Sequence, residues 1–158
     1  MKKLLCALML SIFLVSVIGS ANAILVVQRD EDKSPDGKYG VSITVYGFLD
    51  AQVKKWNKFA IYVKNEGTVK EKIVLKIKGY GAACKAKLTK KTVVLKPGQE
   101  KVVYLKVKPN WFVIPLGGES GEFHVYVKAY VKGKSNVCAS LDLEFTAWYD
   151  LPIRPMTA

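Results

Sequence analysis

The fold of this chain is decided by residues 58–79, KFAIYVKNEGTVKEKIVLKIKG. Apolar and polar side chains alternate on both sides of a central Asn-Glu-Gly, which is a typical turn sequence. In the second half, the odd positions from Glu71 to Ile77 lie on one face and four lysines lie on the other. We therefore expect two consecutive β-strands that form one wall of an antiparallel domain.

The same alternation recurs along the chain, with Gly, Pro and Asn turns at roughly ten-residue spacing. We expect no helix between these turns, we read 48–57 as a loop, and we assign no strand to the small-residue and lysine stretch 80–91. The chain has 158 residues, which suits one domain. The sequence thus predicts an all-β, immunoglobulin-like antiparallel β-sandwich of about seven strands over residues 41–148. Prolines make residues 149–158 an extended C-terminal tail. Further strands are expected over 41–46, 92–95, 101–108, 123–132 and 137–145.

Residues 1–23 have the pattern of a secretory signal peptide, which we expect to be helical. Lys2 and Lys3 precede an apolar run, and a small-x-small motif ends at Ala23. The apolar run is shorter than the ~20 residues that span a bilayer, so an uncleaved membrane anchor is the weaker alternative. We expect cleavage near Ala23 and a secreted or cell-surface protein.

The mature chain then begins with four apolar residues and a polar linker that ends near residue 40. One interpretation is a first strand of the domain, followed by a surface loop. The other is an apolar arm that adds as a strand to a neighbouring subunit, as in donor-strand filament assembly. The four residues of this candidate assembly strand are Ile24, Leu25, Val26 and Val27.

The chain is strongly basic, with 25 basic and 13 acidic residues. Loss of Lys2 and Lys3 on cleavage leaves a formal charge of +10. Such a surface favours anionic partners, although lysines at alternate strand positions also suit a solvated sheet face. Export argues against nucleic acid as a partner.

Two cysteines remain after cleavage, Cys84 and Cys138. In an exported protein an even pair favours a disulfide over a metal site. Closing this loop would stabilise the fold by about 4 kcal/mol. His124 is the only histidine, and no Cys-x-x-Cys or carboxylate cluster accompanies it. We therefore expect neither a metal nor a cofactor.

Pairing of the last two strands gives His124 a partner on the neighbouring strand. If Val131 lies opposite Val137, then His124 lies opposite Glu144. Hydrolysis needs a nucleophile beside an oriented base, or paired carboxylates. A histidine matched to a surface carboxylate supplies neither, so we do not expect an enzyme.

The outer stripe Tyr126, Lys128 and Tyr130 is a candidate binding face for an anionic glycan. Tyrosine offers stacking area and lysine offers charge. The other interpretation is that tyrosine suits any exposed strand face. In the register given above, Tyr126 faces Asp142.

The connection 109–121 contains unusually many large apolar side chains, including Trp111, Phe112 and Ile114. Burying each such side chain is worth ~1.5–3 kcal/mol. These residues either cover one end of the core or form a contact tip for a partner or a membrane.

The run AIYVKNEG…KIVLKIKG…VVLKPGQEKVVYLKVKP…GEFHVYVKAYVKG resembles the CARDB and related immunoglobulin-like modules of archaeal and bacterial surface proteins. In those modules a Val-x-Asn-x-Gly strand end, a Leu-x-Pro-Gly turn and a Gly-x-aromatic strand start recur in this order. The resemblance covers residues 59–132 and implies an adhesion or assembly module rather than a catalyst. The layout and residues 24–27 also resemble exported filament subunits that exchange donor strands.

These observations together predict an exported structural or interaction protein of the cell surface. It would assemble with itself, as a pilus or filament subunit does, or with other envelope proteins. The alternative is a secreted adhesion module that binds anionic polysaccharide.

Overall fold

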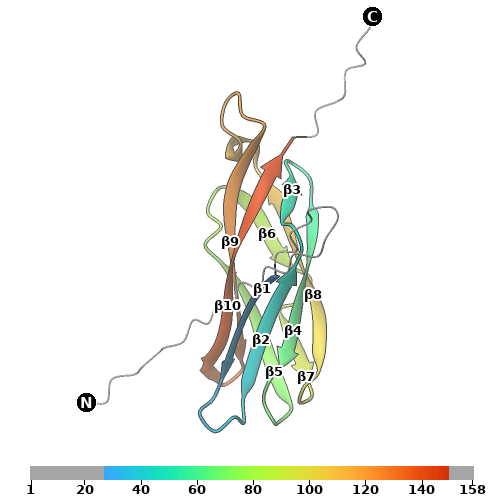
Figure 1. Cartoon of the computed structure of the whole chain (residues 1–158), viewed down its shortest axis with the longest axis vertical. Helices are drawn as coiled ribbons and strands as arrows, with labels where there is room; N and C mark the ends of the chain where they lie inside the picture. The colour runs from blue at the N-terminus through green and yellow to red at the C-terminus, as the bar shows by residue number, and fades with distance from the viewer. Residues whose placement is uncertain (1–26, 150–158) are drawn as a thin grey trace, which may run out of the picture.

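The computed structural model describes residues 27–149, which form an all-β sandwich of two five-stranded sheets (Figure 1). The order is β1-β2-β4-β8-β6 in the first sheet and β3-β10-β9-β5-β7 in the second. The predicted β-sandwich is confirmed, with ten strands instead of about seven. The strands are β1 (Val27–Lys33), β2 (Gly40–Tyr46), β3 (Asp50–Gln52), β4 (Asn57–Asn65), β5 (Glu71–Lys78), β6 (Cys84–Leu88), β7 (Thr92–Leu95), β8 (Glu100–Pro109), β9 (Ser120–Val131) and β10 (Lys134–Trp148).

Three of the predictions fall outside the part of the chain that the structure describes. They are the helical signal peptide over 1–23, the first three residues of the candidate assembly strand (Ile24, Leu25 and Val26), and all of the extended tail except Tyr149.

The stretch 58–79 contributes one strand to each sheet, so the prediction that it forms a single wall is wrong. β4 pairs with β2 and β8 in the first sheet, whereas β5 pairs with β7 and β9 in the second. Alternation of side chains shows which face of a strand is buried, but it does not show which strands pair.

The Asn-Glu-Gly turn between these strands links the two sheets. Asn65 is fully buried, and its Nδ2 donates to the carbonyls of Val69 (2.8 Å) and Leu95 (3.1 Å). Its Oδ1 accepts from the Gly67 N–H at 2.8 Å. A Cβ on Gly67 would lie 2.5 Å from the Lys38 carbonyl oxygen, so only glycine fits there. The side chain of Asn65 thereby ties the end of β4 to β7 of the opposite sheet.

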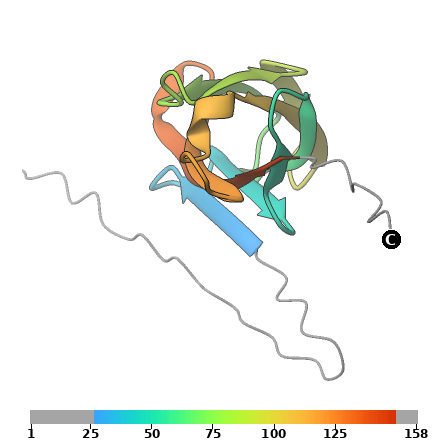
Figure 2. The same ribbon diagram turned by 90° about the horizontal axis from the view of Figure 1, so that it is seen from above.

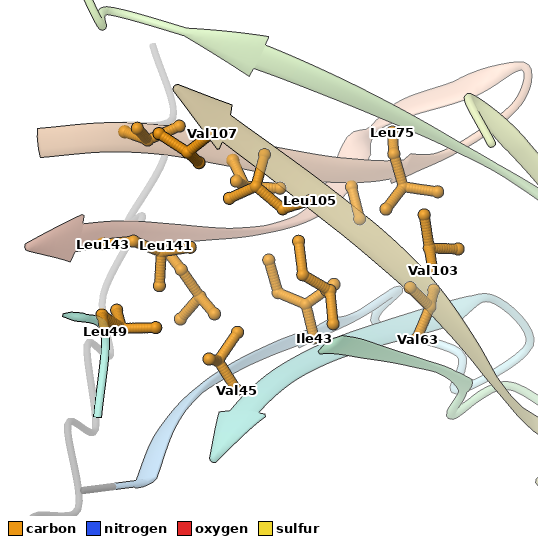
Figure 3. Packing of buried hydrophobic residues seen from close by; sticks show 14 of the residues in the cluster. Ile43, Val45, Leu49, Val63, Leu75, Val103, Leu105, Val107, Leu141 and Leu143 are labelled. Carbon is orange, nitrogen blue, oxygen red and sulfur yellow. The ribbon is translucent and has the colours of Figure 1, made fainter. Parts of the chain in front are cut away.

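The hydrophobic core fills the space between the sheets. Figure 3 shows Ile43 and Val45 of β2 on one side and Leu141 and Leu143 of β10 on the other. In this core, the Phe145 ring packs edge-on against Phe59 and stacks on Phe123, with centroids 4.9 and 5.1 Å apart. Other fully buried side chains are Ile61, Ile73, Leu75, Leu95, Leu105, Val41, Val63, Val103 and Val107.

β1 begins at Val27 and extends to Lys33, into the polar segment that we expected to be a loop or linker. It pairs along its whole length with β2, from Val27 opposite Tyr46 to Lys33 opposite Gly40. Two of its carboxylates bind backbone N–H groups of β10 in the other sheet. Asp30 accepts from Ser140 at 2.6 Å and Asp32 from Cys138 at 2.9 Å. We call these two bonds the β1–β10 seam, which closes one side of the sandwich.

Two further strands lie in segments where we expected no strand. β3 lies within 48–57 and pairs in parallel with the end of β10, so the sandwich is not purely antiparallel. β6 lies within 80–91 and pairs with β8. Each is short, at three and five residues, which limits the alternation that a sequence can display.

The two ends of the sandwich differ. At the upper end in Figure 1, the Val53 N–H donates to Trp148 and the Lys54 N–H donates to Pro109, which brings the ends of β10 and β8 together. The 3-10 turn η1 (Trp111–Val113) follows β8 at this end, and Figure 2 shows it lying over the sandwich. The turns β1–β2 and β9–β10 lie at the lower end.

Candidate interaction surfaces

The predicted disulfide between Cys84 and Cys138 is wrong, because both cysteines are free. Cys84 pairs with Pro109 at the upper end, whereas Cys138 lies near the lower end of β10. Ten residues of β10 separate Cys138 from Trp148, which amounts to ~33 Å at ~3.3 Å per residue. A disulfide needs Cα atoms within about 7 Å of each other. Burial also raises the pKa of the Cys84 thiol to about 11, so this thiol is a poor nucleophile.

The predicted register of β9 and β10 is confirmed over most of the hairpin, with His124 opposite Glu144. The side-chain partner differs, because His124 Nδ1 lies 3.0 Å from Asp142 Oδ1. Asp142 is the diagonal neighbour, which strand twist brings within reach. Near the turn, Val131 pairs with Lys134 because extra residues bulge there. Both members of the histidine pair are more than half exposed, so this pair contributes little to stability.

The predicted face Tyr126, Lys128 and Tyr130 lies on the outer side of the second sheet, in one row along β9. Tyr126 lies opposite Asp142 as expected, but its hydroxyl donates to Ser140 Oγ at 3.1 Å. Carboxylates on β10 flank this row, so the face has mixed charge. A mixed face is a weaker site for a polyanion than a purely basic one.

The apolar connection after β8 combines the two roles proposed from the sequence. Ile114 is only 5% exposed and covers the upper end of the core. Trp111, Phe112 and Leu116 are 56%, 49% and 99% exposed. We call these three side chains the aromatic tip. Leu116 belongs to the apolar run that the sequence singled out.

The aromatic tip is held in place by neighbouring segments. The Tyr149 hydroxyl donates to the Trp111 carbonyl at 2.9 Å. The Asn110 N–H donates to the Ala83 carbonyl at 2.9 Å, and its side-chain amide donates to Ala82. An exposed apolar patch on a fixed loop is typical of a contact surface.

A groove that the sequence did not predict runs between β5 and β6, on the side of the sandwich away from the seam. β7 pairs only with residues 71–74 of β5, which leaves the rest of that edge without a neighbouring strand. The groove has a volume of about 450 Å³. Its floor is apolar and four lysines surround it. The lining residues are Val74, Leu75, Ile77, Tyr80, Ala86, Leu88, Lys76, Lys78, Lys87 and Lys91.

A second feature missed at the sequence level is a group of lysines on the outer face of the first sheet. Each of these lysines occupies an outward position of its strand, as most lysines of this chain do, so the sequence pattern did not distinguish them. Only the pairing of β4, β8 and β6 brings them together. We call Lys58, Lys85, Lys87, Lys106 and Lys108 the lysine face.

Within residues 27–149 no three His, Cys, Asp or Glu side chains are grouped to hold a metal ion. The described part of the chain also has no helix of the length and apolar character that crossing a membrane would need.

No family model matches the chain, and no curated protein matches it. Two solved structures are similar in fold. The ASH / PapD-like domain of human CEP192 (PapD-like domain 7) is 13% identical with a TM-score of 0.44, covering 76% of this chain and 90% of that one. A FixG-related protein from Vibrio parahaemolyticus is 15% identical with a TM-score of 0.45, covering 72% of this chain and 98% of that one. Both likenesses concern the β-sandwich alone.

Proposed function

We propose that this chain is an exported structural protein of the cell surface that assembles with further copies of itself. In the proposed contact, the aromatic tip of one copy enters the β5–β6 groove of the next. The signal-peptide pattern supports export, and the resemblance to CARDB-like modules supports an assembly role. The contact rests on one observation, which is that the tip and the groove are complementary.

The complementarity is both apolar and electrostatic. The tip offers Trp111, Phe112 and Leu116, and the groove offers an apolar floor. Residues 109–127 around the tip include Glu119 and Glu122 and no lysine or arginine, whereas four lysines line the groove. Opposite charges at the rim of an apolar contact steer association and fix its orientation.

Tip and groove are different patches of the same molecule, so the contact is heterologous. Such contacts repeat from copy to copy and give a closed ring or an open filament. Donor-strand exchange through residues 24–27 has less support, because Val27 already pairs with Tyr46 of its own chain. The assembly strand predicted from the sequence is therefore not the contact that we propose.

Light scattering and electron microscopy of the mature protein test this function. We expect rings or filaments, and we expect W111S/F112S/L116S and the groove variant K78E/K91E each to prevent them. Because each variant keeps one intact surface, mixing the two should give 1:1 dimers that do not grow. V94S/V102S, which removes exposed apolar side chains elsewhere, is the matched control and should assemble normally.

Two outcomes would contradict the proposal. One is a wild-type protein that stays monomeric at its highest soluble concentration. The other is assembly that survives both variants but is lost on deletion of residues 24–26, which would restore the donor-strand interpretation.

The second candidate function is adhesion to anionic polysaccharide, which the sequence assigned to Tyr126, Lys128 and Tyr130. The lysine face supports it better than that mixed-charge stripe does.

A further inference from the structure

We propose that the outer face of the first sheet binds acidic polysaccharide through the lysine face. This site adds a ligand to the proposed surface protein and shares only Lys87 with the groove of the self-assembly contact. The site consists of two rows of lysine ammonium groups beside two aromatic rings.

Strand register places the five lysines in two adjacent rows. Lys58 of β4 lies opposite Lys106 of β8, and Lys106 lies opposite Lys87 of β6. Two residues further along, Lys108 lies opposite Lys85. Neighbouring strands are about 4.8 Å apart and the rows are about 7 Å apart. Neighbouring charges are therefore closer than the Debye length of ~8 Å in physiological salt and act together on a ligand.

The lysine face has no acidic partner among the residues that the structure describes. None of the ion pairs within 27–149 involves any of its five lysines. Like charges placed opposite each other in a sheet destabilise it. An anionic ligand would relieve this repulsion.

Protection of a sheet edge does not account for the cluster. Lysines on β6 can guard that edge against unwanted pairing. Lys58, Lys106 and Lys108, however, lie on β4 and β8, which have a neighbouring strand on each side. Their gathering in the interior of the sheet calls for another explanation.

Two aromatic rings lie among the ammonium groups. Lys58 Nζ is 3.7 Å from the centroid of the Tyr104 ring, and Lys87 Nζ is 4.4 Å from that of Trp56. Trp56 is 45% exposed. Aromatic rings give flat apolar area on which the C–H faces of sugar rings can stack. A charged sugar polymer uses both kinds of group, whereas a simple anion uses only the lysines.

The choice of polysaccharide rests on the proposed function, because an exported protein meets acidic polymers of the cell surface. A membrane is a poorer fit, since binding to a bilayer involves apolar side chains that enter the interface. The aromatic tip that could do so covers the upper end, whereas the lysine face points outward from the first sheet and begins one residue below that end, at Lys85 and Lys108.

Calorimetric titration of the mature protein with polygalacturonate, at several salt concentrations, tests this site. For K58Q/K106Q/K108Q we expect about tenfold weaker binding. The plot of the logarithm of the association constant against the logarithm of the salt concentration has a negative slope. In this variant its magnitude should decrease by about two if the polymer resembles a single-stranded polyanion. The control K72Q/K132Q/K134Q removes the same charge from β5 and the β9–β10 turn of the second sheet and should bind within about twofold of wild type.

The inference is overturned if both triple variants lose affinity equally, because the binding would then reflect net charge alone. It is also overturned if neutral dextran binds as well as polygalacturonate. Tighter binding to phosphatidylglycerol vesicles or to a single-stranded oligonucleotide would assign the face to a membrane or a nucleic acid. W111S/F112S/L116S should bind the polymer normally, so failure of self-assembly and failure of this site are distinguishable.

Discussion

Glu71 is a carboxyl group inside the sandwich, on the inward face that the alternation of β5 assigned to it. It is 3% exposed. Its Oε1 accepts from the Gly40 N–H at 2.9 Å, whereas its Oε2 has no hydrogen-bond partner. Burial raises the pKa of Glu71, and the bond from Gly40 opposes this rise only in part. Ionised Glu71 therefore destabilises the folded state.

We predict that E71Q removes a pH-dependent part of the stability. Because the folded-state pKa exceeds the unfolded one, the wild-type stability falls as pH rises from the unfolded pKa through the folded pKa. Glutamine does not titrate, so the unfolding free energy of E71Q relative to wild type should increase as the pH rises from the unfolded pKa of about 4.3 through the raised folded pKa. Urea unfolding across this range measures it. A difference that stays constant with pH would contradict the prediction.

At the scale of single elements, the β1–β10 seam shows how a strand can form without an apolar face. Asp30 and Asp32 accept hydrogen bonds from N–H groups on the side of β10 that faces away from β9. Bonds to a carboxylate are stronger than bonds between neutral groups. β1 is thus fixed by polar contacts across the sandwich as well as by its pairing with β2.

We predict that D30A/D32A opens the seam. The unfolding free energy should fall by about 2–4 kcal/mol, since two part-buried N–H donors lose charged acceptors. Hydrogen exchange should become faster at the amides of Cys138 and Ser140. E31A is the matched control, because Glu31 lies between the two aspartates and binds Arg29 instead. Equal destabilisation by E31A would show that the effect comes from β1 itself and not from the seam.

The elements that the sequence predicted correctly are those with apolar residues at every second position, such as β2 and β8. β1 was missed because its contacts to the other sheet come from aspartates, so no hydrophobic period marks it. β6 did carry a signal, since Cys84, Ala86 and Leu88 alternate with lysines. That signal is only five residues long. Whether β4 and β5 share a sheet depends on a turn that crosses the core, which periodicity does not encode.

At the scale of the whole molecule, the candidate sites differ in how far they could be predicted. The aromatic tip belongs to one continuous apolar run, so its composition alone revealed it. The groove exists because β7 covers only part of β5, which is a property of strand pairing. The lysine face joins side chains from three strands, including Lys58 and Lys106, and their proximity follows only from the register.

The positions of the two thiols at opposite ends give a further prediction. We expect reductant to leave the midpoint of thermal unfolding unchanged. At pH 8 Cys138 should react with a thiol reagent well before Cys84, because a pKa of about 11 leaves only about one Cys84 thiol in a thousand ionised. C138S, which leaves only the buried thiol, should abolish the fast phase. If neither cysteine reacts with the reagent until reductant is added, the two thiols are oxidised, and the prediction that both are free is contradicted.

The first and last strands of the described chain meet across the sandwich, and this affects the timing of folding during synthesis. Of the described strands β1 is made first, but its two aspartates have no N–H donors until β10, the last of them, has been made. β9 likewise waits for β10, its longest partner. This domain of the nascent polypeptide therefore stays incompletely folded until β10 has been made. A translocation channel that threads loose chain would have that whole interval in which to export it.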